Sequence, residues 1–137
     1  MSAVSVLYDP DCGFCRVCVA VLLRWDRRGR LRPVALFGPE ADALLEGMPR
    51  RQQAASWHAV DGNGTVHSAG AAFPPVLAAL PRGGRLAALA RRFPRPVELA
   101  YRWVAEHRTL VGRVVPDSVR SWANDVLRVS GPAPSGR

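Results

Sequence analysis

The sequence contains no lysine: all 19 of its basic residues are arginine, and the formal net charge is +8. Such a bias is what a GC-rich gene produces, so it does not by itself indicate a nucleic-acid partner. The chain also lacks zinc-finger spacing, a helix-turn-helix signal and mixed aromatic and basic runs. We therefore expect no nucleic acid to bind. Eight arginines between residues 82 and 113, against two glutamates, leave a basic interaction surface open as an alternative.

Long hydrophobic runs are absent as well. The longest one, residues 17–23, ends at Arg24 and falls short of the ~20 residues that a membrane-spanning helix needs. Residues 1–8 lack the positively charged start of a signal peptide. We expect a soluble cytoplasmic protein. In that compartment a cysteine pair is more often catalytic or metal-binding than structural.

The hydrophobic pattern predicts an α/β fold. Residues 3–8 and 31–37 are typical of buried strands, and residues 13–27 between them have helical spacing, which together predict a parallel βαβ unit. Asp-Gly and Asn-Gly pairs between residues 57–60 and 65–68 predict a β-hairpin.

Helices make up most of the rest of the predicted domain. They are expected over residues 40–46, 69–80, 86–93, 97–107 and 117–129. The polar residues 49–55 are left without a prediction. A chain of 137 residues fits one domain, so we predict a single domain over 1–130 and a loose tail over 131–137.

Cysteines are scarce, but two of the three form the pattern Cys12-Gly-Phe-Cys15 where the first strand gives way to the first helix. The unpaired N–H groups and dipole of a helix N-terminus stabilise a thiolate, so we predict a pKa for Cys12 below the ~8.5 of a free cysteine. Cys15 lies one turn later, where it can resolve a mixed disulfide. The placement favours a redox pair over two packed cysteines.

The third cysteine extends the pattern to Cys12-x-x-Cys15-x-x-Cys18, which is the first part of a ferredoxin-type cluster run. The fourth cysteine of such a run is missing. His58 and His67 could complete a metal site, but both lie far along the chain on predicted strands. We interpret Cys18 as a packed apolar residue and keep a metal or cluster site as the alternative.

Two aspartates flank the turn before the cysteines. Asp9 and Asp11 could serve only as turn and cap residues. Alternatively, one of them could accept the proton of Cys15 when that thiol attacks. The sequence does not separate the two residues or the two roles.

The segment Tyr8-Asp-Pro-Asp-Cys-Gly-Phe-Cys15 resembles the signature of the DCC family, named after the Asp and the two Cys of its motif. The resemblance continues through residues 59–64, 70–72 and 101–108, and so covers roughly residues 4–113. It implies a thioredoxin-like fold, here with additional C-terminal helices, and a dithiol activity that uses Asp9, Asp11, Cys12 and Cys15. Because some family members occur beside or fused to membrane proteins, it also implies a possible membrane-protein neighbour.

One feature of thioredoxins is missing. Thioredoxins carry a cis-proline just before the strand that faces the cysteines, where it helps to dock the substrate chain, but residues 52–56 before Trp57 contain no proline. This departure puts a thioredoxin-like grip on a protein substrate in doubt. Tyr101 and Arg108 would share one helix face, and we interpret them as a core tyrosine and a solvent arginine. A helix packed near the dithiol is the alternative. Trp57 and two later tryptophans, Trp103 and Trp122, are interpreted as core or half-buried.

The leading hypothesis is a thiol-disulfide oxidoreductase in which Cys12 attacks a substrate disulfide and Cys15 resolves the mixed disulfide. This chemistry needs no bound cofactor and no metal, since a second thiol system supplies the electrons. A metal or cluster protein that uses Cys12, Cys15 and Cys18 is the second hypothesis. A non-enzymatic interaction domain with a basic surface is the third. The identity of the substrate and the oligomeric state stay open.

Overall fold

The computed structural model describes residues 3–130. Its sheet holds four strands: β1 (Val4–Tyr8), β2 (Leu31–Ala35), β3 (His58–Val60) and β4 (Val66–Ser68). Their order is β2-β1-β3-β4; β2 is parallel to β1, whereas β3 pairs antiparallel with β1 and with β4. This arrangement confirms the predicted α/β fold and is consistent with a thioredoxin-like βαβ unit followed by a hairpin. The predicted tail over 131–137 lies outside the described residues.

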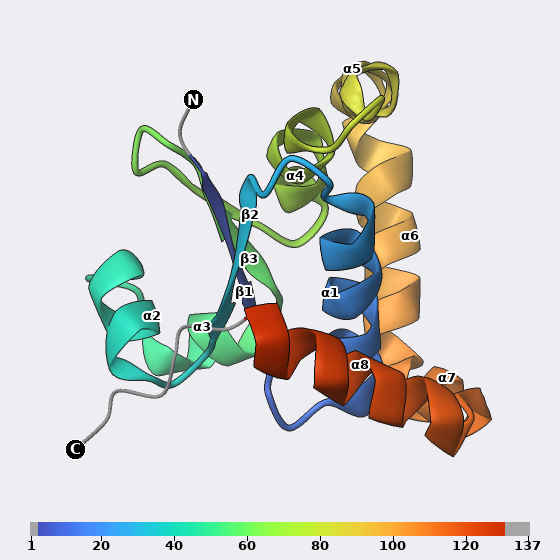
Figure 1. The fold of residues 1–137 in the computed structure, drawn as a ribbon. Coiled ribbons are helices and arrows are strands. Elements are labelled where there is room, and N and C mark those ends of the chain that lie inside the picture. The colour runs from blue at the N-terminus through green and yellow to red at the C-terminus, as the bar shows by residue number, and fades with distance from the viewer. Residues whose placement is uncertain (1–2, 131–137) are drawn as a thin grey trace.

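Helices cover both faces of the sheet (Figure 1). On one side lie α1 (Gly13–Trp25), α4 (Phe73–Ala79) and α6 (Pro94–Glu106), and on the other lie α2 (Pro39–Leu44) and α3 (Arg50–Ala55). The remaining elements are the 3-10 turn η1 (Ala69–Ala72) and the helices α5 (Gly84–Arg92), α7 (Arg108–Val114) and α8 (Asp117–Ser130).

The central strand β1 is buried on both faces because successive side chains of a strand point to opposite sides of a sheet. Val4 and Val6 pack with Val19 of α1 and with residues of α4, while Leu7 packs toward α2. The strand is thereby fixed between two layers of apolar side chains. The cysteine segment follows Tyr8, at the carboxyl end of this central strand.

Several predicted boundaries are wrong, each for a local reason. β2 ends at Ala35 rather than at residue 37, since Phe37 takes a positive φ of 69° and turns the chain. The helix predicted over 69–80 starts as a 3-10 turn, and α4 begins at Phe73 so that Pro74 and Pro75 occupy its first turn, where no N–H is needed. The polar residues 50–55, for which nothing was predicted, form α3.

The late helices are held against the hairpin by two side chains of α6. Glu98 accepts a hydrogen bond from the N–H of Gly70 at 2.8 Å, and the Tyr101 hydroxyl accepts one from the N–H of Trp57 at 3.2 Å. Behind α6 the chain turns at His107 and continues as α7, which the sequence did not predict as a separate helix. These contacts bring α7 beside the N-terminal part of α1 (Figure 1).

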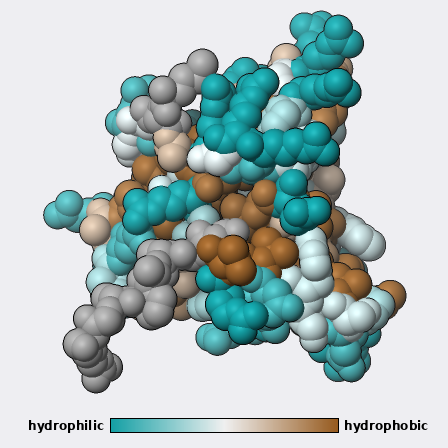
Figure 2. All heavy atoms as spheres, viewed as in Figure 1, coloured by the Kyte–Doolittle hydropathy of each residue, from teal (hydrophilic) through white to brown (hydrophobic). Residues whose placement is uncertain are grey.

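Apolar residues remain at the surface of the C-terminal helices. Figure 2 shows hydrophobic side chains around α7 and a hydrophilic surface at the α5 end of the molecule. Trp57 is half-buried as predicted, but Trp103 is 58% exposed, and Trp122 is also exposed. The interpretation of these two as core or half-buried residues is therefore wrong, because the C-terminal helices pack through only one side.

Candidate active site

Cys12 caps the N-terminus of α1. The chain leaves β1 at Tyr8, turns through residues 9–11 and takes an extended conformation at Cys12 (φ −93°, ψ 110°) before the helix begins. The backbone N–H of Cys15 donates to the Cys12 sulfur at 3.3 Å, so the sulfur replaces the oxygen of an ordinary N-cap residue. An N–H group and the positive end of the helix dipole therefore both act on this sulfur.

Cys15 lies one helical turn later in a different environment. Burial, a hydrogen bond to Cys12 and the nearby Cys12 charge together raise the pKa of the Cys15 thiol to about 12. The Arg108 guanidinium offsets part of this effect, while Asp9 adds to it. Near neutral pH Cys15 is consequently a thiol that keeps its proton, and it needs a base in order to react.

Cys18 follows at the next turn of α1 and does not match its prediction. The residue is exposed, so its interpretation as a packed cysteine is wrong. Its thiol still lies against the protein, and burial raises its pKa to about 11. Within residues 3–130, no group of three His, Cys, Asp or Glu residues is placed to hold a metal ion.

The two histidines proposed for a metal site have other partners. His58 is buried, with Nδ1 2.7 Å from the Ser68 hydroxyl and Nε2 3.0 Å from the carbonyl oxygen of Gln53. His67 lies 2.9 Å from Asp61 in the hairpin, and this hydrogen bond lowers the pKa of the Asp61 carboxyl. Both histidines therefore stabilise the hairpin and its junction with α3.

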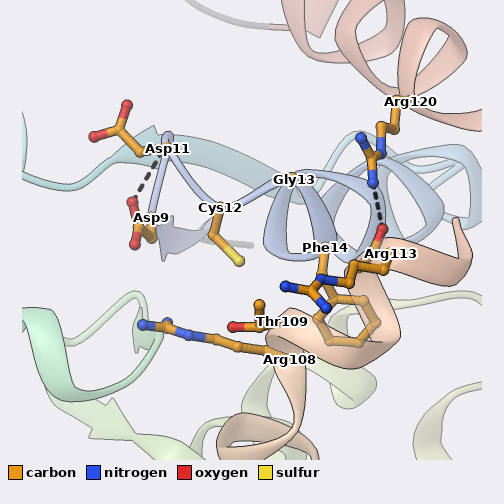
Figure 3. Close-up of a pocket in the computed structure, with 10 residues that line it drawn as sticks. Asp9, Asp11, Cys12, Gly13, Phe14, Arg108, Thr109, Arg113 and Arg120 are labelled. Carbon is orange, nitrogen blue, oxygen red and sulfur yellow. Dashed lines mark hydrogen bonds between the residues drawn. The ribbon is translucent and has the colours of Figure 1, made fainter. Parts of the chain in front are cut away.

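The structure separates the two aspartates. One Asp9 carboxylate oxygen accepts a hydrogen bond from the N–H of Asp11 at 2.9 Å, which fixes the turn, and the charge of this carboxylate acts on Cys15. Asp11 is exposed, and Figure 3 shows its side chain directed away from the Cys12 sulfur. Arg16 supports the same turn by donating to the Pro10 carbonyl oxygen at 3.1 Å.

Cys12 opens into a pocket of about 380 Å³. Its lining comes from the cysteine turn and from two late helices: Asp9, Asp11, Cys12, Gly13, Phe14, Arg108, Thr109, Gly112, Arg113 and Arg120. Figure 3 shows the Cys12 sulfur pointing toward the side of the pocket formed by Arg108, Thr109 and Arg113 of α7. The site thus combines a cysteine sulfur at a helix N-terminus with a positively charged side formed by arginines.

The preferred interpretation of the sequence did not place arginines beside the dithiol. Arg108 is exposed, as expected of a solvent arginine, yet it lines the pocket and acts on Cys15. It does not share a helix with Tyr101, because α6 ends at Glu106. Tyr101 is half-buried and close enough to Cys15 for the two groups to interact electrostatically. The sequence signals were the family-like segment 101–108 for both residues and the basic stretch over residues 82–113 for Arg108.

Comparison with known families agrees with this geometry. A family model described as DCC1-like thiol-disulfide oxidoreductase matches residues 6–114. The chain belongs to this family. The family description indicates redox chemistry at thiols, and the matched region contains both Cys12 and Cys15. No curated protein and no solved structure matches the chain.

The matched region of this DCC1-like chain ends at residue 114, the last residue of α7, so α8 lies outside it. Arg120 of α8 therefore lines the pocket from outside the family match. The packing of α8 against α1 also lies outside the match. Among the described residues, no helix is long and apolar enough to cross a membrane.

Proposed function

We propose that this protein is a dithiol oxidoreductase in which Cys12 is the attacking cysteine and Cys15 the resolving one. The observation that carries the proposal is the difference between the two thiols. Cys12 receives an N–H hydrogen bond at the helix N-terminus and opens into the pocket, whereas the Cys15 thiol is held protonated, with a pKa raised to about 12. Only the thiolate attacks a disulfide.

In the first step the Cys12 thiolate attacks one sulfur of the substrate disulfide. A Cys12–substrate disulfide forms, the substrate S–S bond breaks, and the other half leaves as a thiolate. In the second step Cys15 loses its proton and attacks the Cys12 sulfur, which forms the Cys12–Cys15 disulfide and releases the second half of the substrate as a thiolate. Two electrons pass from the dithiol to the substrate, and a second thiol system returns them.

Asp9 is the carboxylate placed to assist the second step. Its charge already acts on Cys15, whereas the Asp11 side chain points away from the sulfur of Cys12. We therefore assign Asp9, directly or through a water molecule, as the base that accepts the Cys15 proton. This assignment leaves Asp11 as a residue of the turn.

The test is to trap the first intermediate. A Cys15→Ser variant should accumulate a mixed disulfide at Cys12 that is visible by mass spectrometry, because the resolving thiol is gone. Cys12→Ser should form none, and it should still fold because serine is itself a good N-cap residue. Cys18→Ser is the matched control and should behave as the unmodified chain does.

Two outcomes would contradict the proposal. One is an adduct that forms on Cys18 or Cys15 rather than on Cys12. The other is a purified protein with stoichiometric zinc that unfolds on chelation, which would move the cysteines to a structural metal site.

A further inference from the structure

The pocket beside Cys12 contains positive charge that the protein itself does not neutralise. Arg108 and Arg113 make no ion pair with a carboxylate anywhere in residues 3–130. Arg120, in contrast, donates to the Gly112 carbonyl oxygen and lies 3.9 Å from Asp117. Two guanidinium groups are therefore free to bind an anion in the same pocket as the attacking sulfur.

The two carboxylates of the pocket offset only part of this charge, because its lining carries three arginines against two aspartates. Asp9 is engaged by the N–H of Asp11, and the Asp11 side chain points away from the Cys12 sulfur (Figure 3). Arg108, Thr109 and Arg113 lie on the side toward which the sulfur points. A ligand that reaches Cys12 from the pocket thus meets guanidinium groups and a hydroxyl first. Guanidinium forks match the geometry of carboxylate and phosphate oxygens.

The backbone at Trp57 offers no free main-chain group to a peptide. An extended peptide substrate is commonly held by main-chain hydrogen bonds to a free edge. At the start of β3, however, the N–H of Trp57 donates to the Tyr101 hydroxyl, and its carbonyl oxygen accepts from the N–H of Ala69 at 3.2 Å. A volume of about 380 Å³ fits a small molecule. The pocket therefore favours a compact substrate over a protein chain.

We propose that the substrate is a small disulfide whose substituents carry an anionic group such as a carboxylate. Arg108 and Arg113 bind that anion and so hold the scissile S–S bond at the Cys12 sulfur. The inference rests on the proposed function, and the redox step is the one given there: Cys12 bonds to one half of the disulfide, the other half leaves as a thiolate, and a small dithiol such as dithiothreitol re-reduces the protein.

The test compares three disulfides of similar size but different charge: dithiodipropionate (anionic), hydroxyethyl disulfide (neutral) and cystamine (cationic). The rate of mixed-disulfide formation by Cys15→Ser is measured for each and divided by the rate of a small free thiol, which removes differences in intrinsic reactivity. We expect the anionic probe to exceed the neutral one by about tenfold, and cystamine to be slowest. Added salt should reduce this preference, because the pocket is open to solvent.

Arg108→Gln combined with Arg113→Gln, made in the Cys15→Ser background, should bring the anionic-to-neutral ratio close to one. The ratio is the informative quantity, since Arg108 also acts on the dithiol itself. The matched control is Arg27→Gln with Arg28→Gln. It removes the same charge from two exposed residues beyond the opposite end of α1 and should keep the ratio of the parent protein.

A ratio that stays unchanged in the Arg108/Arg113 variant, or a parent protein with no preference for the anionic probe, overturns the inference while the dithiol function stands. A parent protein that forms no adduct at Cys12 with any of the three probes, although its cysteines are reduced and accessible to alkylation, overturns the function as well. A much faster reaction with the disulfides of an unfolded protein, without charge preference, would assign the site to peptide substrates.

Discussion

Cys12 and Cys15 are the same residue type three positions apart, yet the fold places their sulfurs in different surroundings. The sulfur of Cys12 accepts a hydrogen bond from the backbone N–H of Cys15 at the start of α1, while the Cys15 thiol is partly buried and hydrogen-bonded to Cys12. Desolvation disfavours the charged form of a thiol, and a neighbouring thiolate disfavours it further. At the residue scale, these two environments are the basis for proposing Cys12 as the attacking cysteine and Cys15 as the resolving one.

Tyr101 offers a test of how α6 is attached next to this dithiol. Tyr101→Phe removes the only acceptor that the described structure gives the Trp57 N–H, so we expect a loss of about 1 kcal/mol in the free energy of unfolding. Urea denaturation measures it. Tyr8→Phe is the matched control, because the Tyr8 hydroxyl makes no hydrogen bond to a described residue, and it should change stability little. Equal effects of the two substitutions would contradict the role of the Tyr101 hydroxyl.

At the scale of elements, the junction of α4 and α5 depends on the close approach of two backbones. The sequence shows Gly83-Gly84 only as a break between helices. In the structure a Cβ on Gly83 would overlap the carbonyl oxygen of Leu77, whereas a Cβ on Gly84 would meet nothing within 4 Å. Backbone cannot yield as the end of a flexible side chain can, so the two glycines have different tolerances.

Gly83→Ala should therefore destabilise the protein by about 1–3 kcal/mol, the usual cost of overpacking. Gly84→Ala lies at the first residue of α5 and should be neutral or stabilising by up to about 1 kcal/mol, because alanine favours the helix and restricts the unfolded chain. Thermal denaturation of the pair compares them directly. If both variants lose the same stability, then flexibility rather than close packing is what the junction requires.

At the scale of the whole molecule, His58 joins three elements: it lies on β3, contacts Ser68 of β4 and bonds the carbonyl oxygen of Gln53 in α3. Burial lowers its pKa in the folded protein. The unfolded chain has a histidine pKa of ~6.5, so below that pH it takes up a proton that the folded protein resists. The contribution of neutral His58 is complete above ~6.5 and is lost as the pH falls.

We expect the free energy of unfolding to decrease as the pH falls below about 6.5, by up to about 1.4 kcal/mol per pH unit. Urea titrations at several pH values measure this slope. His107→Gln should keep it and His58→Gln should flatten it. Because His58→Gln also alters the contacts of the hairpin junction, an NMR titration of the His58 ring in the unmodified protein is the second readout. A ring that protonates at ~6.5 or above contradicts the prediction.

The sequence by itself determined the local features of this protein. The βαβ unit, the hairpin at residues 61–64 and the cysteine pair at the start of α1 all follow from interactions between residues close in the chain: alternation, turn chemistry and the N-terminus of a helix. The family resemblance added the redox chemistry, which the DCC1-like match over residues 6–114 supports.

Only the tertiary structure decided what surrounds the dithiol. Arg108 and Arg113 lie about a hundred residues from Cys12 in the chain, and they reach the pocket because Glu98 and Tyr101 fasten α6 to the hairpin and the chain then turns at His107. No periodicity encodes such a contact, since it depends on the packing of whole elements. The same holds for the difference between Asp9 and Asp11, which the sequence left equal: in the structure Asp9 accepts the N–H that fixes the turn, and its charge acts on Cys15.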